Sequence, residues 1–383
     1  MCSMSNYSEK SEKEAPLRRG WTTGACATAA TKAALTALVT DSFLDPVGIT
    51  LPKGHAPHFA LAHEMRGDGY CEAGIIKDAG DDPDVTHGAL ILSRVSFGPP
   101  GSGVCFRAGP GVGMVTRPGL PIPVGEAAIN PVPRQLMQDV VRELATIHGF
   151  AGDVVIEISV RNGDKLARKT WNPRLGIVGG LSILGTTGIV VPFSCSAWIH
   201  SIQRGVDVAI AEGQSHVAGC TGSTSEKVVR GLYDLPDFCM LDMGDFVGGM
   251  LKYIRQHPVP RVTIGGGFAK LCKLAQGHMD LHSGRSQVDF DWVAEQLAGI
   301  GASAALVERA RKANTALALL EDAKTEGVDI ATHIANLARD AAVSILRDAA
   351  VSVDIIVVSR QGDLLARTEP SVLGKAPSAG DTQ

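Results

Sequence analysis

Residues Asn172 to Pro192 read NPRLGIVGGLSILGTTGIVVP, and the sequence patterns before and after this stretch differ. The stretch holds five glycines in apolar surroundings, at positions 176, 179, 180, 185 and 188. Ordinary helices and strands do not carry glycine at this density. The stretch therefore predicts tight turns or a backbone that approaches a ligand closely. Two interpretations stay open: a loop whose N–H groups bind a small polar ligand, and a buried glycine-rich corner where two domains meet.

The part before the stretch predicts an α+β domain with mixed or antiparallel strands. Thr22 or Thr23 is a candidate N-cap for the alanine-rich helical segment that follows. Residues 47–113 contain five β-like runs separated by glycine, proline and aspartate. Further along come an amphipathic helix opened by two prolines, an alternating strand and a hairpin signal, at 131–147, 154–160 and Asn162-Gly163.

After the stretch the sequence pattern changes to alternating strands and helices, which predicts a smaller α/β domain. Strand, glycine turn and helix follow one another three times, with the strands at 216–222, 238–244 and 261–267. Helical segments fill residues 288–348, and a last strand covers 353–359. This order is typical of a parallel sheet with crossover helices. We therefore expect domains at 17–192 and 193–368, with flexible tails at 1–16 and 369–383.

Composition excludes several classes of protein. The formal net charge of −4 argues against non-specific binding to nucleic acid, which needs a basic face. No apolar run approaches the roughly 20 residues of a membrane helix, and the polar N-terminal residues do not have the pattern of a signal peptide. The eight cysteines form no CxxC pair, which favours free thiols in the cytoplasm over disulfides or a zinc site.

An aspartate-rich segment follows Lys77. Four aspartates, at positions 78, 81, 82 and 84, fall within seven residues. They can bind a divalent cation, act as a base or face a sulfonium, and the alternative is a structural loop with Asx-turns. The spacing is not that of a calcium loop.

A proline-rich segment, 109–134, is long enough to indicate a functional loop. Its polar candidates are Arg117, Glu126, Asn130 and Arg134. In the second part, Thr221 and Ser223 lie at the carboxyl end of a predicted strand, which is where ligands bind in parallel sheets. Neither a G-x-G-x-x-G after a strand nor a P-loop is present. His278 and His282 lack a third metal ligand, so we expect solvated loop histidines and no protein-bound metal.

Five segments together resemble the CbiD family, the cobalt-precorrin-5B C1-methyltransferases of anaerobic cobalamin biosynthesis. They are RRGWTTGACATAATKAA, KDAGDDPDVTHG, GVGMVTRPGLPIPVGEAAINPVPR, GIVGGLSILGTTGIV and GGFAKLCKLAQGHMDLHS, in that order along the chain. The resemblance runs from Leu17 to Ala366. Asp245 stands where the family pattern has asparagine.

The resemblance implies methyl transfer from S-adenosylmethionine to C1 of cobalt-precorrin-5B, giving cobalt-precorrin-6A. It also implies a ribosomal S5 domain 2-like first domain and a small parallel second domain. The substrate carries its own cobalt and several carboxylates, which basic side chains should bind. Other cobalamin-pathway enzymes are candidate partners, and the oligomeric state is left open.

Residue types then suggest a role for each candidate. We expect Asp81, Asp82 and Asp84 to be catalytic. The substrate-binding candidates are Arg19, Lys77, Arg117, Glu126, Asn130 and Arg134. The candidates for binding the methyl donor are Gly179, Gly180, Ser182, Gly185, Thr186, Thr187, Gly188, Thr221 and Ser223. Two rival functions stay open: a nucleotide-dependent corrinoid reductase and a non-catalytic corrinoid carrier.

Overall fold

The structure, a computed structural model, describes residues 16–371. The expected tails lie outside the described residues except for Pro16 and 369–371, and Ser371 forms a backbone bridge with Val353. The chain forms two compact units. Within the described range, unit 1 comprises 16–114, 126–170 and 179–194, and unit 2 comprises 115–125, 171–178 and 195–371.

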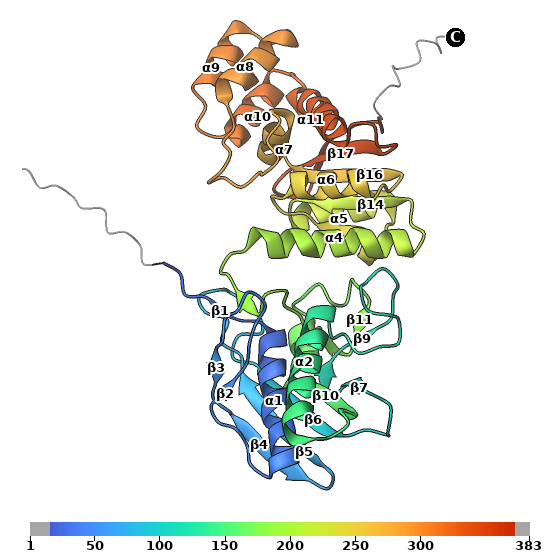
Figure 1. Cartoon of the computed structure of the whole chain (residues 1–383). Coiled ribbons are helices and arrows are strands. Elements are labelled where there is room, and N and C mark those ends of the chain that lie inside the picture. The colour runs from blue at the N-terminus through green and yellow to red at the C-terminus, as the bar shows by residue number, and fades with distance from the viewer. Residues whose placement is uncertain (1–15, 372–383) are drawn as a thin grey trace, which may run out of the picture. The chain divides into compact units, whose positions relative to one another are not determined.

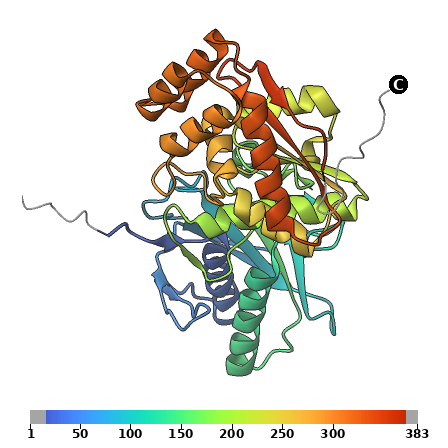
Figure 2. The ribbon, with the colours of Figure 1, turned by 90° about the horizontal axis from the view of Figure 1, so that it is seen from above.

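Unit 1 is built on a five-stranded mixed sheet with the strand order β4-β5-β6-β10-β7. All neighbours are antiparallel except β10 and β7, which run parallel, so the expected mixed pairing is confirmed. The strands are β4 (His63–Gly67), β5 (Tyr70–Ile76), β6 (Leu90–Phe97), β7 (Val104–Ala108) and β10 (Val154–Val160). The helices α1 (Thr23–Thr40) and α2 (Pro131–His148) lie side by side (Figures 1 and 2).

Helix α1 is the central element of unit 1. Its many alanines have small side chains, so neighbouring strands and helices can pack close to its backbone. It packs against β5 and β6 as well as α2, and most of its residues are buried. Helix α2 is amphipathic and begins with Pro131 at its first turn, as the sequence predicts. Its apolar face contributes Met137, Val140 and Leu144 to the same core.

Short elements between residues 20 and 190 complete unit 1, except that β11 and the second residue of β9 belong to unit 2. They are β1 (Gly20–Trp21), β2 (Val47–Gly48), β3 (His58–Phe59), β8 (Gly111–Val112), β9 (Met114–Val115), α3 (Gly163–Ala167), β11 (Ile177–Val178), β12 (Gly180–Leu181) and β13 (Ile189–Val190). The hairpin prediction at Asn162-Gly163 is wrong, because α3 begins there. Asn162 does adopt a left-handed φ of 58°, but Gly163 is required for packing: a Cβ on it would lie 2.2 Å from the Gly111 carbonyl oxygen.

Unit 2 contains a five-stranded sheet with the order β15-β14-β16-β17-β18. The first four strands are parallel, and β18 is antiparallel to β17, so the predicted parallel sheet is confirmed. The strands are β14 (His216–Cys220), β15 (Met240–Asp242), β16 (Arg261–Gly267), β17 (Ser352–Val358) and β18 (Leu364–Arg367).

Helices cover both faces of this sheet. One face carries α5 (Ser223–Tyr233) over a small core. The side chains on the other face belong to a larger core, to which the remaining helices contribute. They are α4 (Cys195–Ala211), α6 (Val247–Gln256), α7 (Phe268–Ala275), α8 (Phe290–Gly299), α9 (Ala304–Arg311), α10 (Ala316–Thr325) and α11 (Ile330–Leu346), with a short 3-10 turn, η1 (Asp237–Cys239), before β15.

A polar network closes the edge of this sheet at which the parallel strands begin. Asp354 is fully buried there and accepts hydrogen bonds from Arg261 Nε (3.0 Å), Thr263 Oγ1 (2.9 Å) and the Tyr233 hydroxyl. The hydroxyl of Thr263 also lies 2.8 Å from His216 Nε2. Side chains therefore fill this edge.

Several glycines in unit 1 are required because backbone segments cross in close contact. A Cβ on Gly20 would lie 2.0 Å from the carbonyl carbon of Ala79, and a Cβ on Gly185 would lie 2.3 Å from Thr22 Oγ1. These contacts bring β1, the aspartate-rich segment and the 184–188 turn together around the start of α1.

We predict that Gly20→Ala destabilises the protein, because the new methyl group meets backbone atoms that cannot rotate away. The expected loss is about 1–3 kcal/mol in the free energy of unfolding, the range for overpacked sites. Gly231→Ala is the matched control, since its Cβ would meet no atom within 4 Å and it lies inside helix α5. Urea denaturation of both variants checks this, and equal stability would contradict it.

Candidate active site

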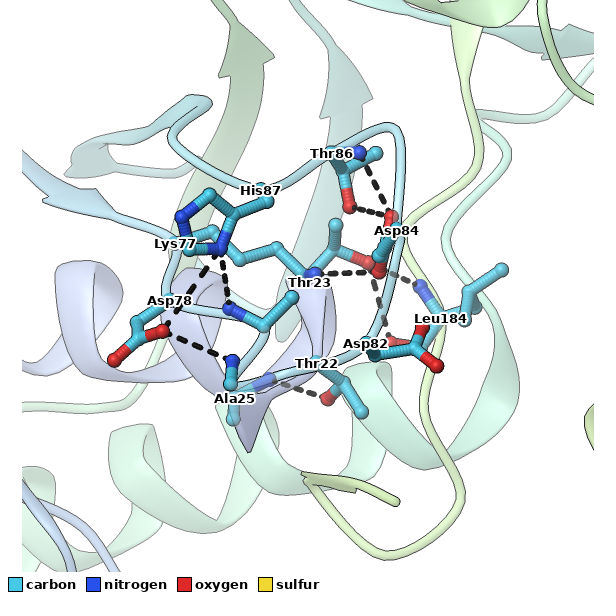
Figure 3. A network of polar contacts seen from close by, with 12 residues as sticks. Thr22, Thr23, Ala25, Lys77, Asp78, Asp82, Asp84, Thr86, His87 and Leu184 are labelled. Carbon is cyan, nitrogen blue, oxygen red and sulfur yellow. Dashed lines mark hydrogen bonds and ion pairs between the residues drawn. The ribbon is translucent and has the colours of Figure 1, made fainter. Parts of the chain in front are cut away.

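The start of α1 is the centre of a polar network in unit 1 (Figure 3). Thr22 is the N-cap, and its hydroxyl accepts a hydrogen bond from Ala25 N at 3.2 Å, which confirms the predicted capping role. Thr23 Oγ1 accepts from Leu184 N at 3.0 Å, and the N–H of Gly24 donates to the Leu184 carbonyl at 2.9 Å. The first N–H groups of a buried helix have no intrahelical acceptor, so these contacts are needed.

The buried Lys77 and the part-buried Asp84 form an ion pair beside this network. Only 1% of Lys77 is exposed, and its Nζ lies 2.6 Å from Asp84 Oδ2. Asp84 Oδ1 accepts from the N–H and hydroxyl of Thr86, at 2.7 and 2.6 Å. Burial raises the pKa of Asp84, but the Lys77 ammonium and the Thr86 donors outweigh it, so the pKa lies below its usual value. Asp84 is therefore ionised and balances the charge of Lys77.

The other three aspartates also have partners. Asp78 receives a bidentate contact from Arg18, with Nη2 at 3.0 Å, and accepts from Gly80 N at 2.9 Å. The hydrogen bond from Arg18 is the main cause that lowers the pKa of Asp78 to about 2. Asp81 accepts from the backbone N–H of Arg18 at 2.6 Å, and Asp82 accepts from Phe193 N at 2.8 Å. The segment is an ordered set of acceptors in which each aspartate side chain has a donor.

Large apolar side chains are exposed next to these carboxylates. Phe193, whose N–H binds Asp82, is 66% exposed, and Leu184, which pairs with Thr23, is 50% exposed. Leu17 and Val191 are exposed beside β1 and β13. Within residues 16–371 the exposed guanidinium of Arg19 makes no ion pair. Apolar contact area beside fixed polar groups is what a flat ligand with a charged rim requires.

The structure gives the other arginine candidates internal partners. Arg134 Nη1 lies 2.6 Å from Glu126, and its other nitrogens donate to the carbonyls of Ile129 and Ala127. Arg117 lies over the Phe238 ring and 3.3 Å from Glu212. Asn130 donates from Nδ2 to the Ile183 carbonyl at 3.2 Å. These contacts hold loops in place, and the substrate-binding roles of Lys77, Arg117, Glu126, Asn130 and Arg134 stay predictions.

The residues predicted to bind the methyl donor fall in two different units. Gly179, Gly180, Ser182 and 185–188 belong to unit 1, whereas Thr221 and Ser223 belong to unit 2. In the first group, Gly180 packs on Gly111 and Gly188 on Leu51, so packing accounts for these glycines without a ligand. Thr187 Oγ1 lies 3.2 Å from the Ile189 carbonyl and Thr186 is exposed. The donor-binding role of the first group stays a prediction.

Thr221 and Ser223 line a cleft of about 1010 Å³ in unit 2. The cleft lies where β14, β16 and β17 end, and its wall includes residues 221–225, 267–270 and 358–361. Lys270 in this wall pairs with Asp245 at 2.9 Å. The position agrees with the expectation that ligands bind beyond the carboxyl ends of parallel strands.

The described residues, 16–371, contain no group of three or more His, Cys, Asp or Glu side chains placed to hold a metal ion. His282 Nδ1 accepts from Gly284 N at 3.1 Å, and Asp280 pairs with Arg285. No helix in that range is long and apolar enough to cross a membrane.

Sequence reasoning missed Arg18, Leu184 and Phe193 as site residues. The Arg18-Arg19 pair was a signal for a basic site, but the sequence does not show that Arg18 reaches Asp78 across 60 positions. The exposure of Leu184 and Phe193 follows from the turns of the glycine-rich stretch, and their apolar character alone predicts burial.

Comparisons with known proteins cover nearly the whole chain. The CbiD family model matches residues 10–192, and the model described as CbiD, C-terminal domain, matches 280–369. A Brucella anthropi protein named cobalt-precorrin-5B C(1)-methyltransferase is 63% identical, over 94% of this chain and 97% of that protein. A Brucella abortus protein of the same name is 62% identical over the same shares.

The chain belongs to the CbiD family. A solved structure, a cobalamin biosynthesis protein (cbiD) from Archaeoglobus fulgidus, is 26% identical and covers 66% of this chain and 77% of its own, with a TM-score of 0.37. The CbiD model includes the start of α1, the aspartate-rich segment and the glycine-rich stretch, whereas the C-terminal model includes the β17 side of the cleft.

We predict that Asp84→Asn destabilises the protein in a pH-dependent way. At pH 7 it leaves Lys77 buried without a counter-charge, which costs about 3–5 kcal/mol. The depressed pKa of Asp84 means that its stabilisation is present above the unfolded value of about 3.9 and is lost as pH falls through the lower folded value. The stability difference between wild type and variant should therefore shrink below about pH 4.

Denaturant melts from pH 7 to pH 2 measure this difference. Asp68→Asn is the control, because Asp68 is exposed in the turn between β4 and β5. A difference for Asp84→Asn that stays constant over the whole pH range would show that its carboxylate does not stabilise the fold through its charge.

Proposed function

We propose that this chain is a cobalt-precorrin-5B C1-methyltransferase that uses S-adenosylmethionine and forms cobalt-precorrin-6A in anaerobic cobalamin biosynthesis. The observation that carries the proposal is the match to relatives of that name, 62–63% identical over 97% of their length. The cobalt belongs to the substrate. Methyl transfer from a sulfonium requires alignment of donor and acceptor and no protein nucleophile.

We place the corrinoid substrate on the surface of unit 1 around the start of α1. Leu184 and Phe193 offer apolar area to one face of the macrocycle. Arg19 has no ion pair within the described residues and is exposed, so it is available to a peripheral carboxylate. The neighbouring Arg18 forms an ion pair with Asp78 and is also exposed.

The chemical step replaces a hydrogen of the macrocycle by a methyl group overall. As the methyl–sulfur bond breaks, the bonding pair stays on sulfur, and a pair from C1 forms the new carbon–carbon bond. The charge that arrives with the methyl group is balanced by loss of a proton from the macrocycle. Asp81 and Asp82 are candidate acceptors for that proton, because Asp81 lies beside Arg18 and Asp82 lies beside the exposed Phe193. Asp84 pairs with Lys77, and its catalytic role stays a prediction.

Three finer points belong to the same proposal. Unit 1 would have the ribosomal S5 domain 2-like arrangement that the resemblance implies, which agrees with a mixed sheet backed by α1 and α2. A cytoplasmic location agrees with the free thiols of described residues such as Cys26, Cys71 and Cys220. Other enzymes of the cobalamin pathway are candidate partners, and the oligomeric state stays open.

The test is an anaerobic assay with purified protein, cobalt-precorrin-5B and S-adenosylmethionine. We expect the corrinoid to gain the mass of one methylene unit and S-adenosylhomocysteine to appear in equal amount. A corrinoid reductase would instead change the hydrogen content and consume a reduced nucleotide. A carrier would bind the corrinoid without changing its mass. Either result would refute the proposal.

We predict that at least one of Asp81→Asn and Asp82→Asn lowers turnover by about 10²–10⁴-fold, the range for lost general acid–base help. Both changes are nearly isosteric, so circular dichroism should show an intact fold. Asp68→Asn serves as the control and should keep normal turnover. Near-normal turnover in both test variants would remove these two carboxylates from the mechanism.

A further inference from the structure

The cleft in unit 2 lies at a topological switch point of the parallel sheet. The chain runs from β14 to its neighbour β15 and then crosses back to β16 on the other side of β14. The loops that follow β14 and β16 therefore leave in opposite directions and open a crevice between them. The volume of about 1010 Å³ lies at the upper end of the roughly 300–1,000 Å³ typical of ligand pockets.

Glycines at the ends of β14 and β16 expose main-chain atoms to this crevice. A Cβ placed on Gly222, after β14, or on Gly267, at the end of β16, would meet no atom within 4 Å. Gly265 and Gly266 differ, because Cβ atoms there would press on Val229 and Thr221 at 2.7 and 2.9 Å. The glycines inside β16 thus serve packing, whereas Gly222 and Gly267 leave space for a ligand to approach the main chain.

Helix starts at the cleft differ in how they are capped. The helices α10 and α11 are capped by Thr315 and Asp329, whose side chains accept from the first turn. The helices α5 and α7 have Gly222 and Gly267 at the N-cap position, so no side chain caps them. Their first N–H groups can therefore bind an anionic group of a ligand in the cleft.

The charge of the cleft wall indicates the kind of ligand. Three acidic residues and three basic residues line it: Glu321, Asp329, Asp363, Lys270, Lys324 and Arg360. Apolar wall comes from Phe268, Leu317 and Leu320. This balance does not suit a polyphosphate, which would need a basic excess. The mixed wall suits a ligand that has an apolar ring, hydroxyl groups, and both a positive and a negative charge.

We propose that this cleft binds the adenosyl methyl donor, an inference that rests on the proposed methyltransferase function. The purine packs on the Phe268 and Leu317 side, a rim carboxylate such as Glu321 accepts from the ribose hydroxyls, and the N–H groups that open α5 hold the donor's carboxylate. Thr221 and Ser223 then belong to the donor site, whereas Gly180, Gly185 and Gly188 in unit 1 serve packing.

The test uses S-adenosylhomocysteine and calorimetry on the full-length protein. Gly267→Val fills the open space without backbone strain, since φ is −72° and ψ is 152°. We expect its affinity for S-adenosylhomocysteine to fall at least about tenfold, a change of 1.4 kcal/mol. Gly299→Val is the matched control, because it also meets open space but lies at the end of α8, outside the cleft wall. Its affinity should equal that of wild type.

Hydrogen exchange on the wild type gives a second measurement that needs no variant. Bound S-adenosylhomocysteine should slow exchange in residues 221–226 and 267–271 and leave 182–188 unchanged. Unaltered affinity in Gly267→Val, or protection confined to 182–188, would overturn the cleft assignment while methyl transfer by the wild type leaves the proposed function standing. A wild type that neither binds S-adenosylhomocysteine nor transfers methyl would overturn both.

Discussion

The buried start of α1 is the constraint on which unit 1 depends. A helix surrounded by core on most sides cannot leave its first N–H groups to water, so other parts of the chain must supply acceptors. Thr22 supplies one, and the Leu184 carbonyl, from far along the chain, supplies another. The 184–188 turn must therefore lie against Thr22, which requires glycine at 185. The need for hydrogen-bond acceptors at the start of α1 thus brings together the segments that form the candidate active site.

The parallel strands of unit 2 could be predicted from local pattern, whereas the antiparallel β18 and the segments 115–125 and 171–178 could not. Each strand, glycine turn and helix of β14–α5 and β16–α7 follows consecutively in the chain, so periodicity and turn residues determine it. The Thr22 cap and the amphipathic helix α2 could be predicted for the same reason, because local residues determine both. The hairpin at Asn162 failed because Gly163 is required by contact with Gly111, which is distant in sequence.

The candidate site was predictable as a set of segments and not as a set of partners. Sequence analysis shows that four carboxylates lie close together, but not that Arg18, Lys77 and the Phe193 N–H would meet them. It likewise marks Arg134 as a cation available to a substrate, whereas in the structure its nitrogens bind Glu126 and two nearby carbonyls. Charge at a position follows from residue type, and its availability depends on the tertiary neighbours.

Unit 2 also includes two segments, 115–125 and 171–178, that come from within the first half of the chain. Through them it gains Arg117, which covers Phe238 and pairs with Glu212, and Arg174, which pairs with Glu226 and donates to the Met240 carbonyl. A gene cut after Ser194 would encode a second half that lacks both arginines, so Glu212 would lose its ion pair with Arg117 and Glu226 would keep only its ion pair with Arg230. The two units are therefore not exchangeable modules, and recombination between relatives can preserve unit 2 only if all three of its segments are inherited together.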